Sequence, residues 1–235
     1  MTYTDFPAVL PILANNRSFN IIIGNNTDAH EMQNYLKEHS KSPKNVAFGF
    51  QTSAGSRKDG RIICIRGGGR QMVLGGLDGP IPFESKLHQA FAKTKYKLIY
   101  HENIDAWLKN HIVPIVALNY VTVIHESQMK KIAKDDKLLQ QMITAMDEGF
   151  SVLEALNYPL TPAKQDALIR KWPMLMRLFM KIYHWLPISR QVNGSVDEII
   201  ALGRVFRHWK ETRVLTPNWD KLENKFKDKV ADKYT

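Results

Sequence analysis

Hydrophobic positions near the N-terminus follow the pattern of an α/β fold. Residues 6–14 predict a short helix, and residues 19–23 form an unbroken apolar run that is typical of a parallel strand buried on both faces. The run ends in the turn sequence 24–28, from which a helix over 28–38 is expected to begin. The order helix, strand, helix predicts part of a doubly wound sheet. Because such a sheet does not usually begin in this way, we expect its first strands to be missing from the chain.

The pattern then changes to short strands. Apolar segments at 46–50, 61–65 and 71–75 are separated by glycine-rich turns and predict an antiparallel extension of the sheet. A helix over 82–93 and a strand over 96–100 close this section.

From Ile104 onward the apolar positions recur almost throughout at helical spacing. Helices are expected over 104–124, 127–133, 135–156, 162–184, 195–212 and 217–232. We therefore predict an α/β domain over residues 1–102, followed by an all-α domain over residues 103–235.

Residues 172–186 are rich in methionine and aromatic side chains, with Arg177 and Lys181 on one stripe. These interruptions make the segment unsuited to span a bilayer. It either lies on a membrane surface or packs in a core or dimer interface. The second alternative is favoured, because methionine-rich aromatic helices usually pack against protein.

Composition and charge narrow the class of protein. The 235 residues are 44% hydrophobic and 24% charged, as in ordinary soluble globular proteins. A net charge of +10 favours an anionic partner such as nucleic acid, a membrane surface or a phosphorylated cofactor. The tail over 221–233 alternates in sign like a solvated helix, so we expect no nucleic-acid partner. No membrane partner is expected either, because packing against protein is favoured for residues 172–186. The single cysteine, Cys64, and the lack of a signal peptide indicate a cytoplasmic setting.

Lys109 is the most informative candidate for chemistry. It lies in an otherwise apolar helical run, two residues after Trp107. Because an ammonium is costly to desolvate, such a lysine is paired, reaches the surface, or serves as a proton donor. The adjacent Asn110 and His111 point to other faces of the helix and are expected in solvent.

Other polar features allow more than one interpretation. Gly24 and Asn25 follow a predicted strand, where open α/β sheets bind ligands, but asparagine is equally suited to a left-handed turn. Asp197 and Glu198 open a helix, where acidic side chains commonly complement the helix dipole. The run Gly67–Gly69 is a strand turn and not a dinucleotide fingerprint, because methionine stands where the third glycine is needed. The histidines show no ligand spacing, so no metal site is predicted.

Taken together, these segments resemble the ketopantoate reductase (2-dehydropantoate 2-reductase) family of NADPH-dependent oxidoreductases. Five segments match in order: 21–26, the strand set with Gly55 and Gly67–Gly69, 105–109, 198–203 and 216–218. Their order and the Trp-x-Lys sequence at 107–109 carry the resemblance, which extends from about residue 3 to the end of the chain.

The resemblance implies a partial Rossmann-like NADP-binding domain without its first strands and glycine loop, followed by a helical substrate and dimerisation domain. It implies that hydride passes from NADPH to a small 2-keto acid, giving a 2-hydroxy acid. Lys109 would then protonate or polarise the ketone oxygen. Asn25, with Gly24, would lie beside the nicotinamide and the substrate.

The resemblance also assigns the remaining substrate contacts. Glu198, or Asp197 if the register slips by one, would hold the substrate hydroxyl. Ser189 or Arg190 would replace the serine-rich segment that binds the substrate carboxylate in the family.

Two departures from the family pattern limit these implications. Two asparagines that usually follow the lysine on the same face are replaced by Val113 and Ala117, so ketopantoate itself is not the expected substrate. The glycine fingerprint is also missing, so tight NADPH binding is not expected. The alternative function is a non-catalytic helical interaction or dimerisation module that retains the reductase fold, and a homodimer is compatible with either function.

Overall fold

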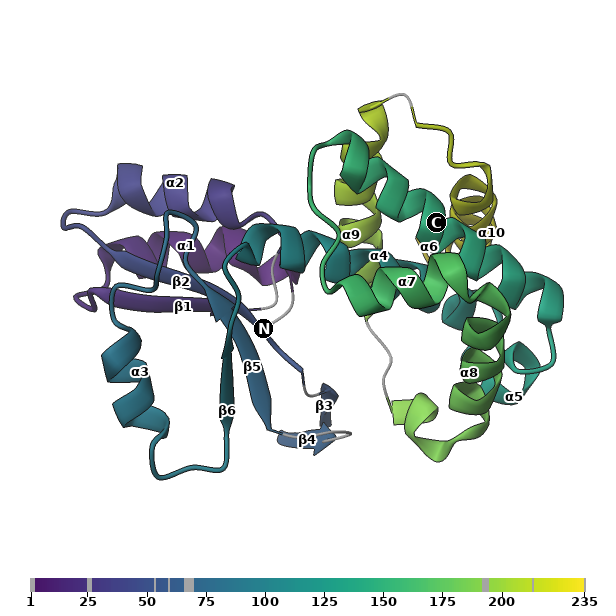
Figure 1. The fold of residues 1–235 in the computed structure, drawn as a ribbon, viewed down its shortest axis with the longest axis horizontal. Helices are drawn as coiled ribbons and strands as arrows, with labels where there is room; N and C mark the ends of the chain where they lie inside the picture. The colour runs from purple at the N-terminus through teal and green to yellow at the C-terminus, as the bar shows by residue number, and fades with distance from the viewer. Residues whose placement is uncertain are drawn as a thin grey trace. The chain divides into compact units, whose positions relative to one another are not determined.

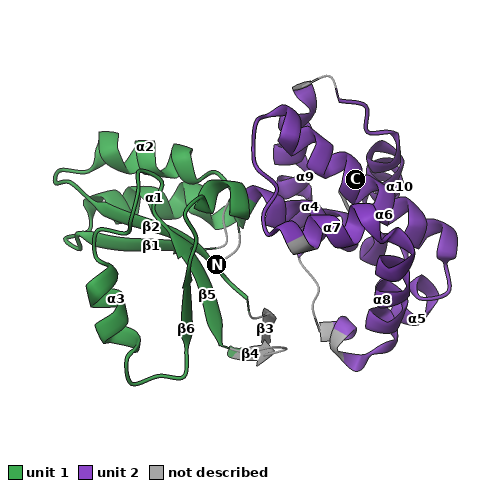
Figure 2. Cartoon of the chain, viewed as in Figure 1, with its two compact units in different colours: residues 1–108 green, residues 109–235 purple. Residues whose placement is uncertain are grey.

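The computed structural model describes residues 3–24, 27–52, 54–58, 60–65, 70–191, 195–212 and 214–234, and of these it describes the backbone alone at 54–58, 62–65, 164, 188, 191, 212 and 232–234. The chain divides into two compact units, residues 1–108 and residues 109–235 (Figure 2).

Unit 1 is built on a four-stranded sheet with the order β1-β2-β5-β6 (Figure 1). The strands of this sheet are β1 (Asn20–Gly24), β2 (Asn45–Gln51), β5 (Gln71–Gly75) and β6 (Lys97–Tyr100). The first and last pairs are parallel, whereas β2 and β5 are antiparallel. The helical elements of the unit are η1 (Tyr3–Asp5), α1 (Phe6–Asn15), α2 (Ala29–His39) and α3 (Glu84–Phe91).

Strand β1 is buried on one face only, so the prediction of burial on both faces is wrong. Ile21 and Ile23 are 6% and 2% exposed, but Ile22 between them is 39% exposed. The inner pair packs with Phe6 of α1 and Leu36 of α2 in one apolar core. Side chains alternate across a strand, so helices on one face leave the middle isoleucine outside.

The segment 61–65 does not extend the main sheet as predicted. It forms β4 (Arg61–Ile65), which pairs antiparallel with β3 (Ala54–Lys58) in a separate two-stranded sheet. Gly60 between them has a φ of 73°, which glycine adopts without steric cost. The sequence Asp59-Gly60 is a common hairpin signal and could have revealed this pairing.

Unit 2 is entirely helical in its described part. It contains α4 (Ile104–Ile124, from Lys109 onward), α5 (Met129–Ile132), α6 (Asp136–Ala155), α7 (Ala163–Lys171), α8 (Pro173–Trp185), η2 (Pro187–Gln191), α9 (Val196–Trp209), η3 (Lys210–Thr212) and α10 (Pro217–Tyr234). The predicted fold class, a partial Rossmann-like sheet followed by a helical domain, is confirmed. None of the helices in the described part of the chain combines the length and apolar character needed to cross a bilayer.

The core of unit 2 is aromatic. Trp219 of α10 is fully buried, and its ring stacks on Phe206 of α9 with the centroids 3.7 Å apart. Tyr120 of α4 contacts Trp219 edge-on, with the ring centroids 6.0 Å apart. Burial of these rings joins α4, α9 and α10.

One predicted helix is two helices in the structure. The segment 162–184 breaks at Trp172, between α7 and α8, because a proline at 173 disfavours helical geometry in the residue before it. The outer side of α8 does not pack in the core of this chain, because Met174, Leu178 and Phe179 are more than half exposed, and packing in a dimer interface stays a prediction.

Candidate functional site

Lys109 is buried, with 7% of its surface exposed. Its Nζ lies 4.9 Å from the ring centroid of Tyr158 and 6.0 Å from that of Trp209. Attraction between a cation and aromatic ring faces offsets part of the cost of burying the ammonium. Of the three explanations open to the sequence, a lysine that reaches the surface is therefore excluded.

A hydrogen bond beside Lys109 holds one of these rings in place. Nδ2 of Asn110 donates to the carbonyl oxygen of Pro159 at 3.0 Å, and Asn110 is 2% exposed. This bond fixes the segment after α6 against α4, so that the preceding Tyr158 ring covers the ammonium. The expectation that Asn110 faces solvent is wrong, because that distant segment packs on it.

His111 is also less exposed than expected. It is half-buried, and burial lowers its pKa to about 4 because desolvation disfavours the charged imidazolium. The imidazole is therefore neutral at pH 7 and adds no positive charge beside Lys109.

The face of α4 below Lys109 is apolar. Val113 and Ala117, one and two turns further along, are both fully buried. Val113 faces Gly149 of α6, where an added Cβ would lie 2.6 Å from its Cγ1. Lys109 is thus the polar end of a stripe that otherwise packs in the core.

The acidic pair at the start of α9 lies in a capped first turn. Ser195 is the N-cap, and its Oγ accepts a hydrogen bond from the backbone N–H of Glu198 at 3.2 Å. Glu198 is half-buried and Asp197 is exposed. Both carboxylates are placed to complement the helix dipole, and a ligand-binding role for either stays a prediction.

Ser189 has a structural partner. It is 1% exposed, and its Oγ donates to the carbonyl oxygen of Leu186 at 2.8 Å, just after α8 ends. The neighbouring Arg190 is exposed. Of these two candidates for the substrate carboxylate, only Arg190 presents its polar group to solvent.

In unit 1, the cofactor candidates are only partly described. Gly24 ends β1, and an added Cβ there would meet nothing closer than the carbonyl oxygen of Gly49 at 3.8 Å. Asn25 and the run Gly67–Gly69 lie outside the described residues. Gly24 is thus not a point of close backbone approach.

The helix that follows β1 does not favour a phosphate. Asp28 precedes α2 and accepts a hydrogen bond from the Tyr3 hydroxyl, and Glu31 lies in the first turn. A helix N-terminus attracts anions, but the negative charges of these two carboxylates weaken that attraction here. Within the described residues, the start of α2 therefore disfavours a cofactor diphosphate.

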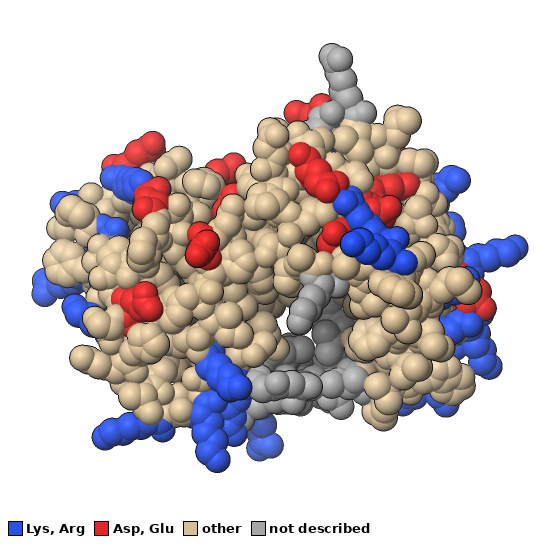
Figure 3. All heavy atoms as spheres, in the orientation of Figure 1, with Lys and Arg blue, Asp and Glu red and all other residues tan. Residues whose placement is uncertain are grey.

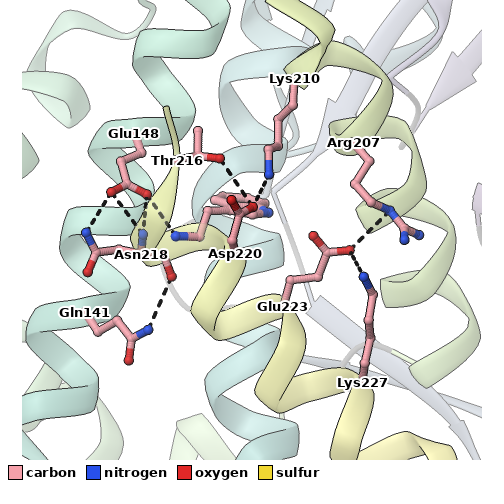
Figure 4. Close-up of polar contacts among 10 residues, drawn as sticks. Gln141, Glu148, Arg207, Lys210, Thr216, Asn218, Asp220, Glu223 and Lys227 are labelled. Carbon is pink, nitrogen blue, oxygen red and sulfur yellow. Dashed lines mark hydrogen bonds and ion pairs between the residues drawn. The ribbon is translucent and has the colours of Figure 1, made fainter. Parts of the chain in front are cut away.

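A set of polar contacts fixes the helix that carries Trp209. Glu223 of α10 is 4% exposed and pairs with Arg207 at 3.1 Å and with Lys227 at 2.9 Å. Lys210, directly after α9, pairs with Asp220 (Figure 4). The Arg207–Glu223 and Lys210–Asp220 pairs anchor the C-terminal end of α9 to α10 and hold the Trp209 ring over Lys109.

The predicted site residues thus fall in both units. Lys109, Ser189, Arg190, Asp197 and Glu198 belong to residues 109–235, and Gly24 belongs to residues 1–108. The sequence analysis does not single out Tyr158 or Trp209, because no local spacing links these distant residues to the lysine. Among the described residues, no group of three His, Cys, Asp or Glu side chains could hold a metal ion.

Comparison with known proteins shows a likeness in fold. No protein-family model and no curated protein matches the chain. The dimeric ketopantoate reductase of Staphylococcus aureus matches with 16% identity and a TM-score of 0.69, over 99% of this chain and 76% of that one. D-mandelate dehydrogenase with NADH and anilino(oxo)acetate matches with 13% identity and a TM-score of 0.72, over 100% of this chain and 76% of that one. A putative ketopantoate reductase from Ralstonia solanacearum MolK2 matches with 15% identity and a TM-score of 0.71, over 100% of this chain and 76% of that one. The chain shares the fold of these proteins.

Proposed function

We propose that the chain is a ketopantoate-reductase-like oxidoreductase that reduces a small 2-keto acid to a 2-hydroxy acid, with NADPH as the source of hydride. The observation that carries this proposal is the buried ammonium of Lys109, held between two aromatic rings. It lies on the helix that leads out of the Rossmann-like unit, in a fold shared with ketopantoate reductases and D-mandelate dehydrogenase.

A buried ammonium is suited to ketone reduction. Negative charge develops on the ketone oxygen as the carbonyl carbon accepts hydride, and a fixed cation beside that oxygen stabilises the charge. The interaction is stronger away from bulk water, and the ammonium supplies the proton that completes the alcohol. The two ring contacts help to position Nζ.

The other assignments belong to the same proposal. Glu198, or Asp197, holds the hydroxyl of the substrate, and Arg190 binds its carboxylate. Asn25 and Gly24 lie beside the nicotinamide and the substrate. We assign Ser189 to capping the end of α8, because its hydroxyl is buried and already donates to the backbone.

The substrate is proposed to be a 2-keto acid other than ketopantoate. Val113 and Ala117 are buried in the core at the positions where the resemblance leads one to look for asparagines. Neither side chain can form a hydrogen bond with a polar group of the substrate.

One observation favours a second function. Among the described residues, Asp28 and Glu31 place two carboxylates near the N-terminus of α2, which disfavours binding of a diphosphate there. The second candidate is therefore a helical interaction or dimerisation module that retains the reductase fold without catalysis.

A titration and one substitution distinguish these functions. We expect NADPH fluorescence to report binding and 2-keto acids to drive NADPH oxidation. Lys109→Met should lower kcat/KM by about 100-fold or more without weakening NADPH binding. Lys86→Met, on the exposed side of α3, is the matched control and should match the wild type. Full activity of Lys109→Met would remove the lysine from the mechanism, and a stable dimer that binds no NADPH would establish the second function.

A further inference from the structure

The outer side of α8 is an exposed apolar face. Its members share an exposure of 48–73%: Trp172, Met174, Leu175, Leu178, Phe179, Ile182, Trp185 and Leu186. We call this set the α8 face. The opposite side of the helix, with Met176, Met180 and His184, is buried and packs on the bundle of α5, α6 and α7.

The α8 face is too large for an incidental patch. Exposed apolar side chains are common singly, but a contiguous set of this size marks a site of interaction with protein or membrane. Helices on a protein surface normally turn charged residues outward, whereas α8 turns apolar side chains outward. An occupant with apolar chemistry is therefore required.

The charges near the α8 face are basic at both ends. Lys171 precedes the face at its N-terminal end, and Nζ of Lys130 lies 5.7 Å from the ring centroid of Trp185 at the other end. Lys131 of α5 and Lys134 just after it are exposed as well, next to Asp135 and Asp136, which pair with His125 and Lys181. Over α8 the space-filling surface is largely tan, with blue side chains at its margin (Figure 3).

The charged side chains of α8 itself are set to one side. Lys181 pairs with Asp136 at 2.7 Å, and Arg177 pairs with the same carboxylate at 4.0 Å. Both are therefore turned away from the α8 face toward α6, which leaves the face apolar along its length.

Like charges disfavour a second copy of the chain as the occupant. If two α8 faces paired in antiparallel fashion, Lys171 of one copy would approach Lys130 of the other. If they paired in parallel, each lysine would approach its own counterpart. Both directions bring cations together around a desolvated interface, which is costly.

An anionic lipid surface satisfies the apolar and the basic features together. A helix of 13 residues is about 20 Å long, too short to span a bilayer but suited to lie in its interface. Apolar side chains then enter the acyl boundary, tryptophans at both ends sit at headgroup level, and lysines meet the phosphates.

We propose that the α8 face binds an anionic membrane surface, with α8 lying in the plane of the interface. The expectation from the sequence favours packing against protein instead. We favour a membrane surface over a protein partner because the whole α8 face is exposed and basic residues lie at both of its ends. The proposal is independent of the proposed reduction.

The tryptophans of the chain provide a direct test. Of the five tryptophans, Trp172 and Trp185 are 61% and 52% exposed, whereas Trp107, Trp209 and Trp219 are at most 8% exposed. With phosphatidylcholine vesicles that contain phosphatidylglycerol, we expect a blue shift of tryptophan emission and quenching by brominated acyl chains. Vesicles of phosphatidylcholine alone should bind more weakly, and added salt should weaken the anionic binding.

Two substitutions locate the contact. Leu178→Glu combined with Phe179→Glu should lower vesicle partitioning by about tenfold or more, because both side chains leave water on binding. Leu215→Glu is the matched control: Leu215 is 87% exposed but lies outside the α8 face, so partitioning should not change. Circular dichroism checks the fold of each variant, and quenching of the wild type needs no variant.

Three results would overturn the proposal. The first is the absence of anionic-vesicle binding by the wild type, and the second is binding by the double variant equal to that of the wild type. The third is a dimer in light scattering that the double variant abolishes, without vesicle binding. That result would establish a second copy of the chain as the occupant.

Discussion

At the scale of single residues, one carboxylate organises the start of the last helix. Glu148 of α6 accepts hydrogen bonds from the backbone N–H groups of Asn218 and Trp219, at 2.9 and 2.8 Å, and from Nδ2 of Asn218 at 2.7 Å (Figure 4). The first N–H groups of a helix have no partner inside it, so a carboxylate from a neighbouring helix satisfies them. The bond also holds Trp219 in the core, which the sequence Thr216-Pro217-Asn218 by itself does not reveal.

We predict that Glu148→Gln destabilises the protein by about 2 kcal/mol, because hydrogen bonds to a charged acceptor are lost and an amide N–H then faces other donors. Glu126→Gln is an isosteric control. Glu126 pairs with Lys229 at 2.8 Å on the exposed surface, and its substitution should have no measurable effect. Urea unfolding of both variants measures the difference, and equal stabilities would contradict the capping role.

At the scale of elements, α4 and α6 approach closely at one glycine. A Cβ added at Gly149 would lie 2.6 Å from Cγ1 of Val113 and 3.3 Å from the ring of Trp219. Glycine lowers helix stability, but here its missing side chain lets two helices and a buried tryptophan meet. The same contact keeps Val113 in the core below Lys109.

We predict that Gly149→Ala lowers stability by about 1–2 kcal/mol, since overpacking costs more than the gain in helix propensity returns. Adding Val113→Ala opens space for the new methyl group. The double variant should therefore lose less than the sum of the two single losses, as a thermal or urea double-mutant cycle can show. Strict additivity would mean that the two side chains do not compete for the same space.

At the scale of the whole molecule, the division between the two units falls inside a helix. Residues 104–108 begin α4 but pack in unit 1, where Ile104, Trp107 and Leu108 belong to the core. The Trp107 ring lies 5.8 Å from that of Phe50. A domain boundary at 102, as the sequence predicts, would separate these side chains from their core.

We predict that a fragment of residues 103–235 unfolds cooperatively, because the aromatic core of Tyr120, Phe206 and Trp219 lies wholly within it. A fragment of residues 1–102 should melt without a sharp transition, since it lacks three core side chains contributed by α4. Far-UV circular dichroism during heating distinguishes the two. A sharp transition in 1–102 would show that the first turn of α4 is dispensable to unit 1.

Several features follow from the sequence because they are local. The bounds of α4 match those expected from its apolar spacing, and β1 and β5 lie within one residue of their predictions. Periodicity depends only on near neighbours along the chain. Lys109 is conspicuous for the same reason, as one cation in an apolar helical run.

Other features depend on segments that meet only in the folded chain. Tyr158 and Trp209 reach Lys109, and Pro159 removes Asn110 from water, although no spacing along the chain connects them. In the same way, the spacing of residues along α8 does not predict which side of this helix packs on the rest of the protein and which side stays exposed. Hydrophobic periodicity and secondary-structure propensity are set by neighbours along the chain, whereas burial is set by neighbours in space. The sequence by itself therefore determined the elements, and tertiary packing alone decided the surroundings of Lys109.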